Sequence, residues 1–69
     1  MAKQIRNTIR RLRFDADEMT QQQLADKVEV SRQTIVAIEK GKYSPSLEVA
    51  FKIAEVFNKP LSEVFSYSD

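Results

Sequence analysis

The stretch TQQQLADKVEVSRQTIVAIEK, residues 20–40, decides the fold because it contains two short helices separated by a turn. Thr20 is a typical N-cap, and Gln23 stands three residues later, where its side chain can return the hydrogen bond and complete a capping box. Leu24 and Val28 then follow at the spacing of one buried helix face. This pattern predicts a short amphipathic helix directly after the N-cap.

The second half of the stretch predicts another helix, over residues 31–40. Ser31 is an N-cap candidate, and Ile35 and Ile38 are spaced to contact a core. Gly41 can take the left-handed conformation that ends a helix. Two short helices joined by a three-residue turn predict a helix-turn-helix.

Apolar residues at helical spacing predict three further helices around this stretch. The first covers about residues 4–13, the fourth follows Pro45 and ends near Asn58, and the fifth covers residues 60–65. No segment alternates with a period of two, so we expect no strands and a short tail at residues 66–69. The expected core residues are Ile5, Ile9 and Leu12 in the first helix, Leu47, Ala50, Ile53, Ala54 and Phe57 in the fourth, and Leu61, Val64 and Phe65 in the fifth.

These elements predict an all-α fold, a compact five-helix bundle. The length of 69 residues predicts one domain that covers residues 1–69, with its core over about residues 5–65. A chain of this size buries only about 60% of the surface that its unfolded form exposes, so its stability is marginal.

The composition excludes several classes of function. The chain has no cysteine and no histidine, which removes disulfides, the commonest metal ligands and the usual acid–base side chain near neutral pH. No apolar run approaches the ~20 residues that cross a bilayer, and the basic N-terminus lacks the apolar segment of a signal peptide. We therefore expect a cytoplasmic protein that is not an enzyme, binds no cofactor or metal and does not bind a membrane.

Charge is distributed unevenly, although the net charge is only +1. Residues 1–14 carry five basic side chains and no acidic one, which is compatible with nucleic-acid binding, although a basic helix is usually only a solvated face. Asp15, Asp17 and Glu18 could suggest a metal site, but they lack the glycine and the distal glutamate of a calcium loop. A solvated acidic loop is the simpler interpretation.

The helix over residues 31–40 leaves Arg32, Gln33, Val36 and Ala37 on its outer face. Arginine matches the O6 and N7 acceptors of guanine, glutamine can pair with adenine, and small apolar groups suit thymine methyls. The alternative is a solvated face of helix-tolerant residues. Helix-turn-helix proteins insert the N-terminal half of this helix into the major groove, so we expect these four residues to contact bases.

Several separate segments resemble one known family in order and spacing. They are Thr20-Gln21, Leu24-Ala25, Val30-Ser31-Arg32-Gln33-Thr34-Ile35, Ile38-Glu39-Lys40-Gly41-Lys42 and Pro45-Ser46-Leu47. The chain resembles the Cro and phage-repressor family, also called xenobiotic-response-element regulators, over roughly residues 5–65. The resemblance implies a lambda-repressor-like domain that binds specific double-stranded DNA and regulates transcription, with repression as the favoured outcome. The alternative is a protein-interaction module, antitoxin-like or an adaptor, on the same scaffold.

Further residues are expected to hold the DNA backbone or the scaffold. Gln21 opens its helix, where amide groups can bind a phosphate. Lys40 and Lys42 follow the helix over residues 31–40 and could bind phosphates, or they could only increase the solubility of the helix end and the loop. The resemblance implies that Glu39 pairs with Arg13 as a structural ion pair. The full set of expected phosphate contacts is Gln21, Thr34, Lys40, Lys42 and Tyr43.

One such helix contacts only a few base pairs, so we expect a homodimer on a palindromic operator. Val64, Phe65 and Tyr67 are the expected contact surface, unless Val64 and Phe65 complete the core of the monomer. The chain shows no effector domain, so we expect no small-molecule effector. Glu29 stands where the family usually has glycine, and a left-handed conformation there costs on the order of 1 kcal/mol.

Overall fold

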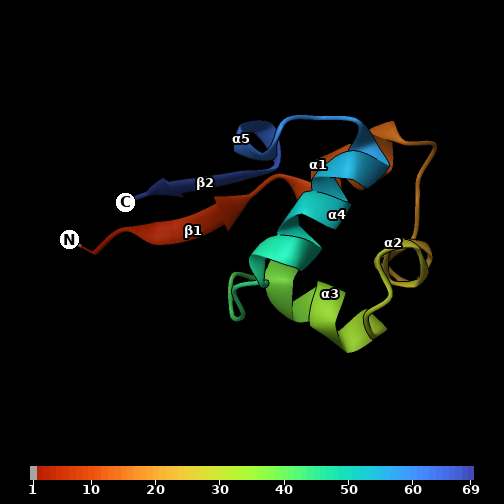
Figure 1. Ribbon diagram of the computed structural model, residues 1–69, viewed down its shortest axis with the longest axis horizontal. Coiled ribbons are helices and arrows are strands. Elements are labelled where there is room, and N and C mark those ends of the chain that lie inside the picture. Colours follow the sequence, from red (N-terminus) through yellow and green to blue (C-terminus); the bar gives the residue numbers. More distant parts are fainter. Residues whose placement is uncertain (1) are drawn as a thin grey trace.

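Five helices and two short strands make up residues 2–69, the part of the chain that the computed structural model describes. The helices form one body, and the strands project from it (Figure 1). In chain order the elements are β1 (Gln4–Asn7), α1 (Ile9–Asp15), α2 (Gln21–Val28), α3 (Arg32–Glu39), α4 (Leu47–Phe57), α5 (Leu61–Val64) and β2 (Phe65–Ser68).

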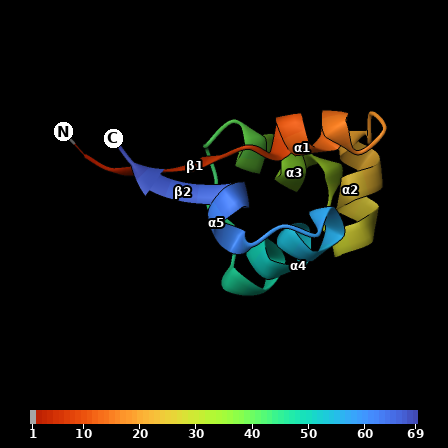
Figure 2. The same ribbon diagram turned by 90° about the horizontal axis from the view of Figure 1, so that it is seen from above.

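The prediction of an all-α fold is wrong at the two ends of the chain. β1 and β2 pair in an antiparallel two-stranded sheet, in which Ile5 lies opposite Tyr67 and Asn7 opposite Phe65. This ribbon places Gln4 opposite Ser68 and projects from the helices (Figure 2). The first helix therefore begins at Ile9 rather than at residue 4, and residues 66–68 form a strand instead of a tail.

Asn7 and Thr8 form the hydrogen bonds at which β1 ends and α1 begins. The Asn7 Oδ1 atom accepts from the backbone N–H of Ile9 at 3.1 Å. The Thr8 N–H donates to the carbonyl of Val64 at 3.0 Å, and its hydroxyl donates to the carbonyl of Glu63 at 2.7 Å. Glu63 and Val64 lie 55 or more residues from Thr8 along the chain. The local periodicity of Ile5 and Ile9 could therefore not reveal these two contacts.

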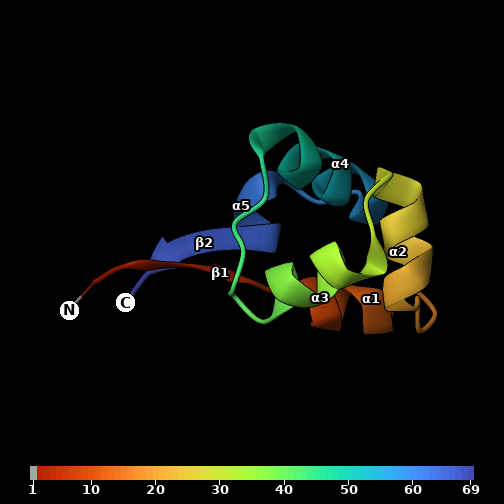
Figure 3. The same ribbon diagram turned by 90° about the horizontal axis from the view of Figure 1, so that it is seen from below.

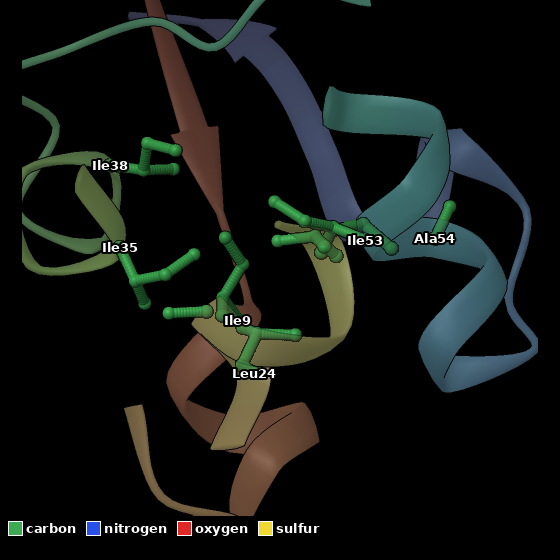
Figure 4. Close-up of a cluster of buried hydrophobic side chains, with 9 residues drawn as sticks. Ile9, Leu24, Ile35, Ile38, Ile53 and Ala54 are labelled. Atoms are coloured by element: carbon green, nitrogen blue, oxygen red, sulfur yellow. The ribbon is translucent and has the colours of Figure 1, made fainter. Parts of the chain in front are cut away.

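The hydrophobic core lies between α1, α2, α3 and α4 and is closed by α5 (Figure 4). Val64 is fully buried, so it completes the core of the monomer, and Phe65 packs partly against that core. Two expected core residues are on the surface. Ile5 lies in the ribbon at 41% exposure, and Leu47 is 72% exposed in the first turn of α4. The largest buried side chains are Ile9, Leu24, Val28, Ile35, Ile38, Ile53 and Val64.

The turn between α2 and α3 keeps its shape without a glycine. Glu29 has a φ of 62° and lies in the left-handed region, where its N–H still donates to the carbonyl of Ala25. A side chain in this conformation costs on the order of 1 kcal/mol, which the buried contacts of both helices offset. The capping box of Thr20 and Gln23 is present, and the Ser31 hydroxyl caps α3, as the sequence predicted.

Candidate nucleic-acid interface

α2 and α3 pack against each other and place α3 on the outside of the helical body (Figure 3). Leu24 and Ala25 of α2 are buried, as are Ile35 and Ile38 of α3. All four belong to one core cluster. The inward residues therefore anchor α3 from one side, and its other side remains available to a partner.

The outer face of α3 carries the four residues that were expected to contact bases. Arg32 and Gln33, in the first turn, are exposed, whereas Val36 and Ala37 are half-buried. Val36 lines a groove together with Gln21 and Arg32, at the place where α2 begins. The exposed polar residues thus stand at the N-terminal end of α3, which is the end that helix-turn-helix proteins insert into DNA.

A partly buried ion pair joins α1 to the end of α3. The Arg13 Nε atom lies 2.6 Å from Oε2 of Glu39, and Nη2 of Arg13 lies 3.1 Å from Oε1. The remaining guanidinium nitrogen, Nη1, donates to the carbonyl of Met19 at 2.8 Å. The two side chains are only 14% and 9% exposed. This two-pronged geometry fixes the orientation of α3 relative to the scaffold.

Gln21 connects this ion pair to the exposed start of α3. Its Nε2 atom donates to Oε1 of Glu39 at 3.2 Å, and its Oε1 atom accepts from Nη2 of Arg32 at 3.4 Å. Arg32, Gln21, Glu39 and Arg13 therefore form a continuous polar chain from the outer face into the body.

The structure brings together part of the expected phosphate-binding set. Lys40 lines the same groove as Gln21, while Lys42 is exposed in the loop after α3. The Thr34 hydroxyl lies 2.9 Å from that of Ser31, within the cap of α3. Tyr43 lies elsewhere, because it lines a separate groove beneath the ribbon with Ile5 and Tyr67.

Two residues of this region were not singled out from the sequence. Arg10 of α1 lines the groove that also contains Arg13, Arg32 and Lys40, so one more basic side chain reaches the site. Its position three residues before Arg13 was the available signal, because residues three apart share a helix face. Asn7 donates from Nδ2 to the carbonyl of Ile38 at 2.9 Å and so ties the end of α3 to β1. The sequence held no local signal for that contact.

Two searches of residues 2–69 give negative findings. Within this part of the chain, no helix combines the length and the apolar character needed to span a membrane. The same residues contain no group of three or more Asp or Glu side chains placed to hold a metal ion.

Fold and surface together define a helix-turn-helix protein, and comparison with known proteins gives its family. The helix-turn-helix family model matches residues 9–64, so the chain belongs to this family, of the xenobiotic-response-element type. The chain is 59% identical over 51 residues to an HTH-type transcriptional regulator of Methanocaldococcus jannaschii, and this alignment covers 74% of this chain and 77% of the relative. It is 57% identical over 51 residues to an HTH-type transcriptional regulator of Archaeoglobus fulgidus, covering 74% and 73% respectively. It is also 38% identical over 61 residues to the cryptic phage CTXphi transcriptional repressor RstR of Vibrio cholerae, covering 88% of this chain and 54% of RstR.

Proposed function

We propose that this protein is a sequence-specific regulator of transcription that binds double-stranded DNA through α3. The observation that carries the proposal is the exposed pair Arg32 and Gln33 on a helix held in place by the Arg13–Glu39 ion pair. Relatives that share more than half of the aligned residues are named transcriptional regulators. Repression is favoured over activation because RstR is named a repressor. The proposal includes no enzymatic reaction, no cofactor and no small-molecule effector, and it places the protein in the cytoplasm with the DNA.

The residues divide between reading bases and holding the backbone. Arg32 and Gln33 can form paired hydrogen bonds with guanine and adenine, and Val36 and Ala37 can contact thymine methyls. Basic and polar groups around them supply phosphate contacts, which orient a protein on the duplex but carry little sequence information. The proposed phosphate contacts are Arg10, Gln21, Thr34, Lys40 and Lys42. Tyr43 is left out of this set because it lines the separate groove with Ile5 and Tyr67.

Binding to a pool of random duplex DNA at several salt concentrations tests the proposed function. We expect the affinity for DNA to fall steeply as the salt concentration rises, because binding releases cations from the DNA. A plot of log K against log salt concentration should have a slope of about −0.9 per phosphate neutralised. Selection from the same pool should enrich one motif. A module that binds only proteins would show negligible DNA affinity even at low salt, and that result would favour the antitoxin-like or adaptor alternative.

A second copy of the chain is the proposed partner on DNA, because one α3 contacts too few base pairs to select a site. Two-fold dimers read half-sites about one helical turn apart, so a palindromic operator follows. Val64 is buried and cannot contribute to the contact. Of the expected contact residues, Tyr67 is exposed, at 65%, on a face of the ribbon where it lies opposite Ile5. This face lines a groove with Tyr43, directly after α3.

We expect Tyr67→Asp to weaken dimerisation roughly tenfold or more, because aromatic anchors dominate such contacts and a charge there must be desolvated. Sedimentation equilibrium and the stoichiometry on a palindromic duplex measure the effect. Phe14→Asp is the matched control, since Phe14 is equally exposed but lies on α1 and lines a different groove. A wild-type monomer at high concentration, bound one-to-one to the palindrome, would contradict the proposed dimer.

A further inference from the structure

Asn7 joins the exposed ribbon to the buried end of α3. Its Nδ2 atom donates to the carbonyl of Ile38 at 2.9 Å, and its Oδ1 atom accepts from the N–H of Ile9 at 3.1 Å. Its backbone lies in β1, opposite Phe65 of β2. One side chain therefore connects the ribbon, the start of α1 and the last turn of α3.

The carbonyl of Ile38 is a group that needs a partner from outside its helix. The last carbonyls of a helix have no partner within the regular helix, so turns, side chains or water must satisfy them. Ile38 is only 1% exposed, and its carbonyl accepts from the N–H of Gly41 at 3.0 Å and from Asn7. A carbonyl only accepts and the N–H of Ile9 only donates, so the amide of Asn7 has a single workable orientation. Asn7 thus completes the C-terminal cap of α3.

The ribbon that carries Asn7 has little support from the rest of the chain. Apart from Asn7 and Phe65, which lie at its base, the paired residues of β1 and β2 are exposed. A two-stranded ribbon alone is marginally stable in water. The face with Ile5 and Tyr67 is the proposed contact with a second copy, and a contact made only by the paired ribbon stabilises that pairing.

We propose that Asn7 is a positioning residue that couples dimerisation at the ribbon to the end of α3. This inference rests on the proposed function and adds a regulation of its DNA affinity. When β1 pairs with β2, the backbone of Asn7 is held opposite Phe65 and its amide reaches Ile38. When the ribbon opens, this placement is lost and the Ile38 carbonyl loses a donor. The coupling is reciprocal, so DNA that holds α3 also tightens the dimer.

The last turn of α3 therefore has one permanent and one conditional attachment. Arg13 holds Glu39 from α1, inside the helical body, and this ion pair does not involve the ribbon. Asn7 holds the preceding residue and depends on the ribbon. The N–H of Lys42 donates to the carbonyl of Ala37 at 2.9 Å, so the loop with this proposed phosphate contact is attached to the same turn. The conditional attachment thus influences where that lysine lies.

Amide hydrogen exchange of the free protein tests the coupling without DNA. The N–H groups of Gly41 and Lys42 report on it, because both donate to carbonyls of α3. We expect their protection to be roughly three- to tenfold greater in the dimer than in the monomer of the wild type, the range that one hydrogen bond accounts for. Asn7→Ser should abolish this difference, since its hydroxyl can still accept from Ile9 but is too short to reach Ile38.

Thr8→Val is the matched control at the same junction. It removes the hydroxyl that donates to the carbonyl of Glu63 at 2.7 Å, a bond that does not involve α3. This variant should keep the difference in protection between dimer and monomer. Sedimentation shows at which concentrations each protein is monomeric or dimeric, and melting curves check that each is folded. The same difference in Asn7→Ser as in wild type, its absence from wild type, or a wild type that never dimerises would overturn the proposal.

Affinity for a duplex with a single half-site separates this inference from the proposed function. Per α3, the wild-type dimer should bind this duplex more tightly than the Tyr67→Asp monomer by the factor seen in exchange. In an Asn7→Ser background, the dimer and the Tyr67→Asp monomer should bind it alike. Absence of DNA binding by every variant would contradict the proposed function, and with it the regulation. Normal DNA binding with no effect of Asn7→Ser would overturn the coupling alone.

Discussion

Replacement of Glu39 with alanine should lower the free energy of unfolding by about 3–5 kcal/mol, because removal of one partner of a buried ion pair leaves the other charge uncompensated. Arg13 would keep only the carbonyl of Met19 as a partner in a site where it is 14% exposed. Native domains have a total stability of roughly 5–15 kcal/mol, so this loss is a large fraction of the total and should lower the melting temperature markedly. Thermal and urea unfolding of the two proteins measure the difference.

Two comparison variants make this result specific to burial. Glu48→Ala removes an exposed ion pair, in which the Glu48 side chain is 80% exposed and its partner is Lys52. This change should lower the free energy of unfolding by only ~0–1 kcal/mol. The double variant Arg13→Met with Glu39→Leu should recover part of the lost stability, since apolar replacement of both partners avoids the uncompensated charge. A Glu39→Ala protein that melts close to wild type would show that the pair does not contribute to stability.

Arg32→Ala should reduce affinity for the preferred DNA site by about 1–3 kcal/mol and relax selectivity at one or two base pairs. Gln33→Ala should do the same at a neighbouring position. Both side chains are exposed, so neither change should alter the melting temperature much. Binding to the preferred site and to a scrambled site across a salt series measures these effects. Equal losses of affinity on the preferred and the scrambled site would show that this face of α3 does not read the base sequence.

Lys42→Ala, in the same experiment, should weaken all sequences alike and make the salt slope shallower by about one unit. The expected cause is the loss of one phosphate contact, which releases one fewer cation. Lys59→Ala is the matched control, because Lys59 lines a different groove with Arg11 and Asp15. A loss of selectivity in Lys42→Ala would show that this lysine reads a base.

The helix-turn-helix could be predicted because its signals are local. The capping box of Thr20 and Gln23 and the Ser31 cap each depend on residues three apart, and the structure contains both. Glu29 takes the left-handed conformation that the turn requires, although only the resemblance to other proteins indicated that requirement. The direction in which α3 faces followed from the spacing of Ile35 and Ile38.

The candidate site was predicted in part, for a related reason. The outer residues of α3 follow from helical spacing, and the structure places Arg32 and Gln33 on that surface. Arg10 and the hydrogen bond between Gln21 and Glu39 were missed, since they depend on how α1 and α2 lie against α3. Tyr43, which follows α3 closely in sequence, instead turns toward the ribbon.

By itself, the sequence determined where α2, α3 and α4 lie, because caps and apolar spacing act over three or four residues. Only the tertiary structure decided the ends of the chain. The Ile5–Ile9 spacing is equally compatible with a helix, but β1 pairs with β2 more than 55 residues away, and Asn7 bonds to α3. A strand of four residues satisfies its backbone groups only through that partner, and periodicity within a single segment contains no information about it.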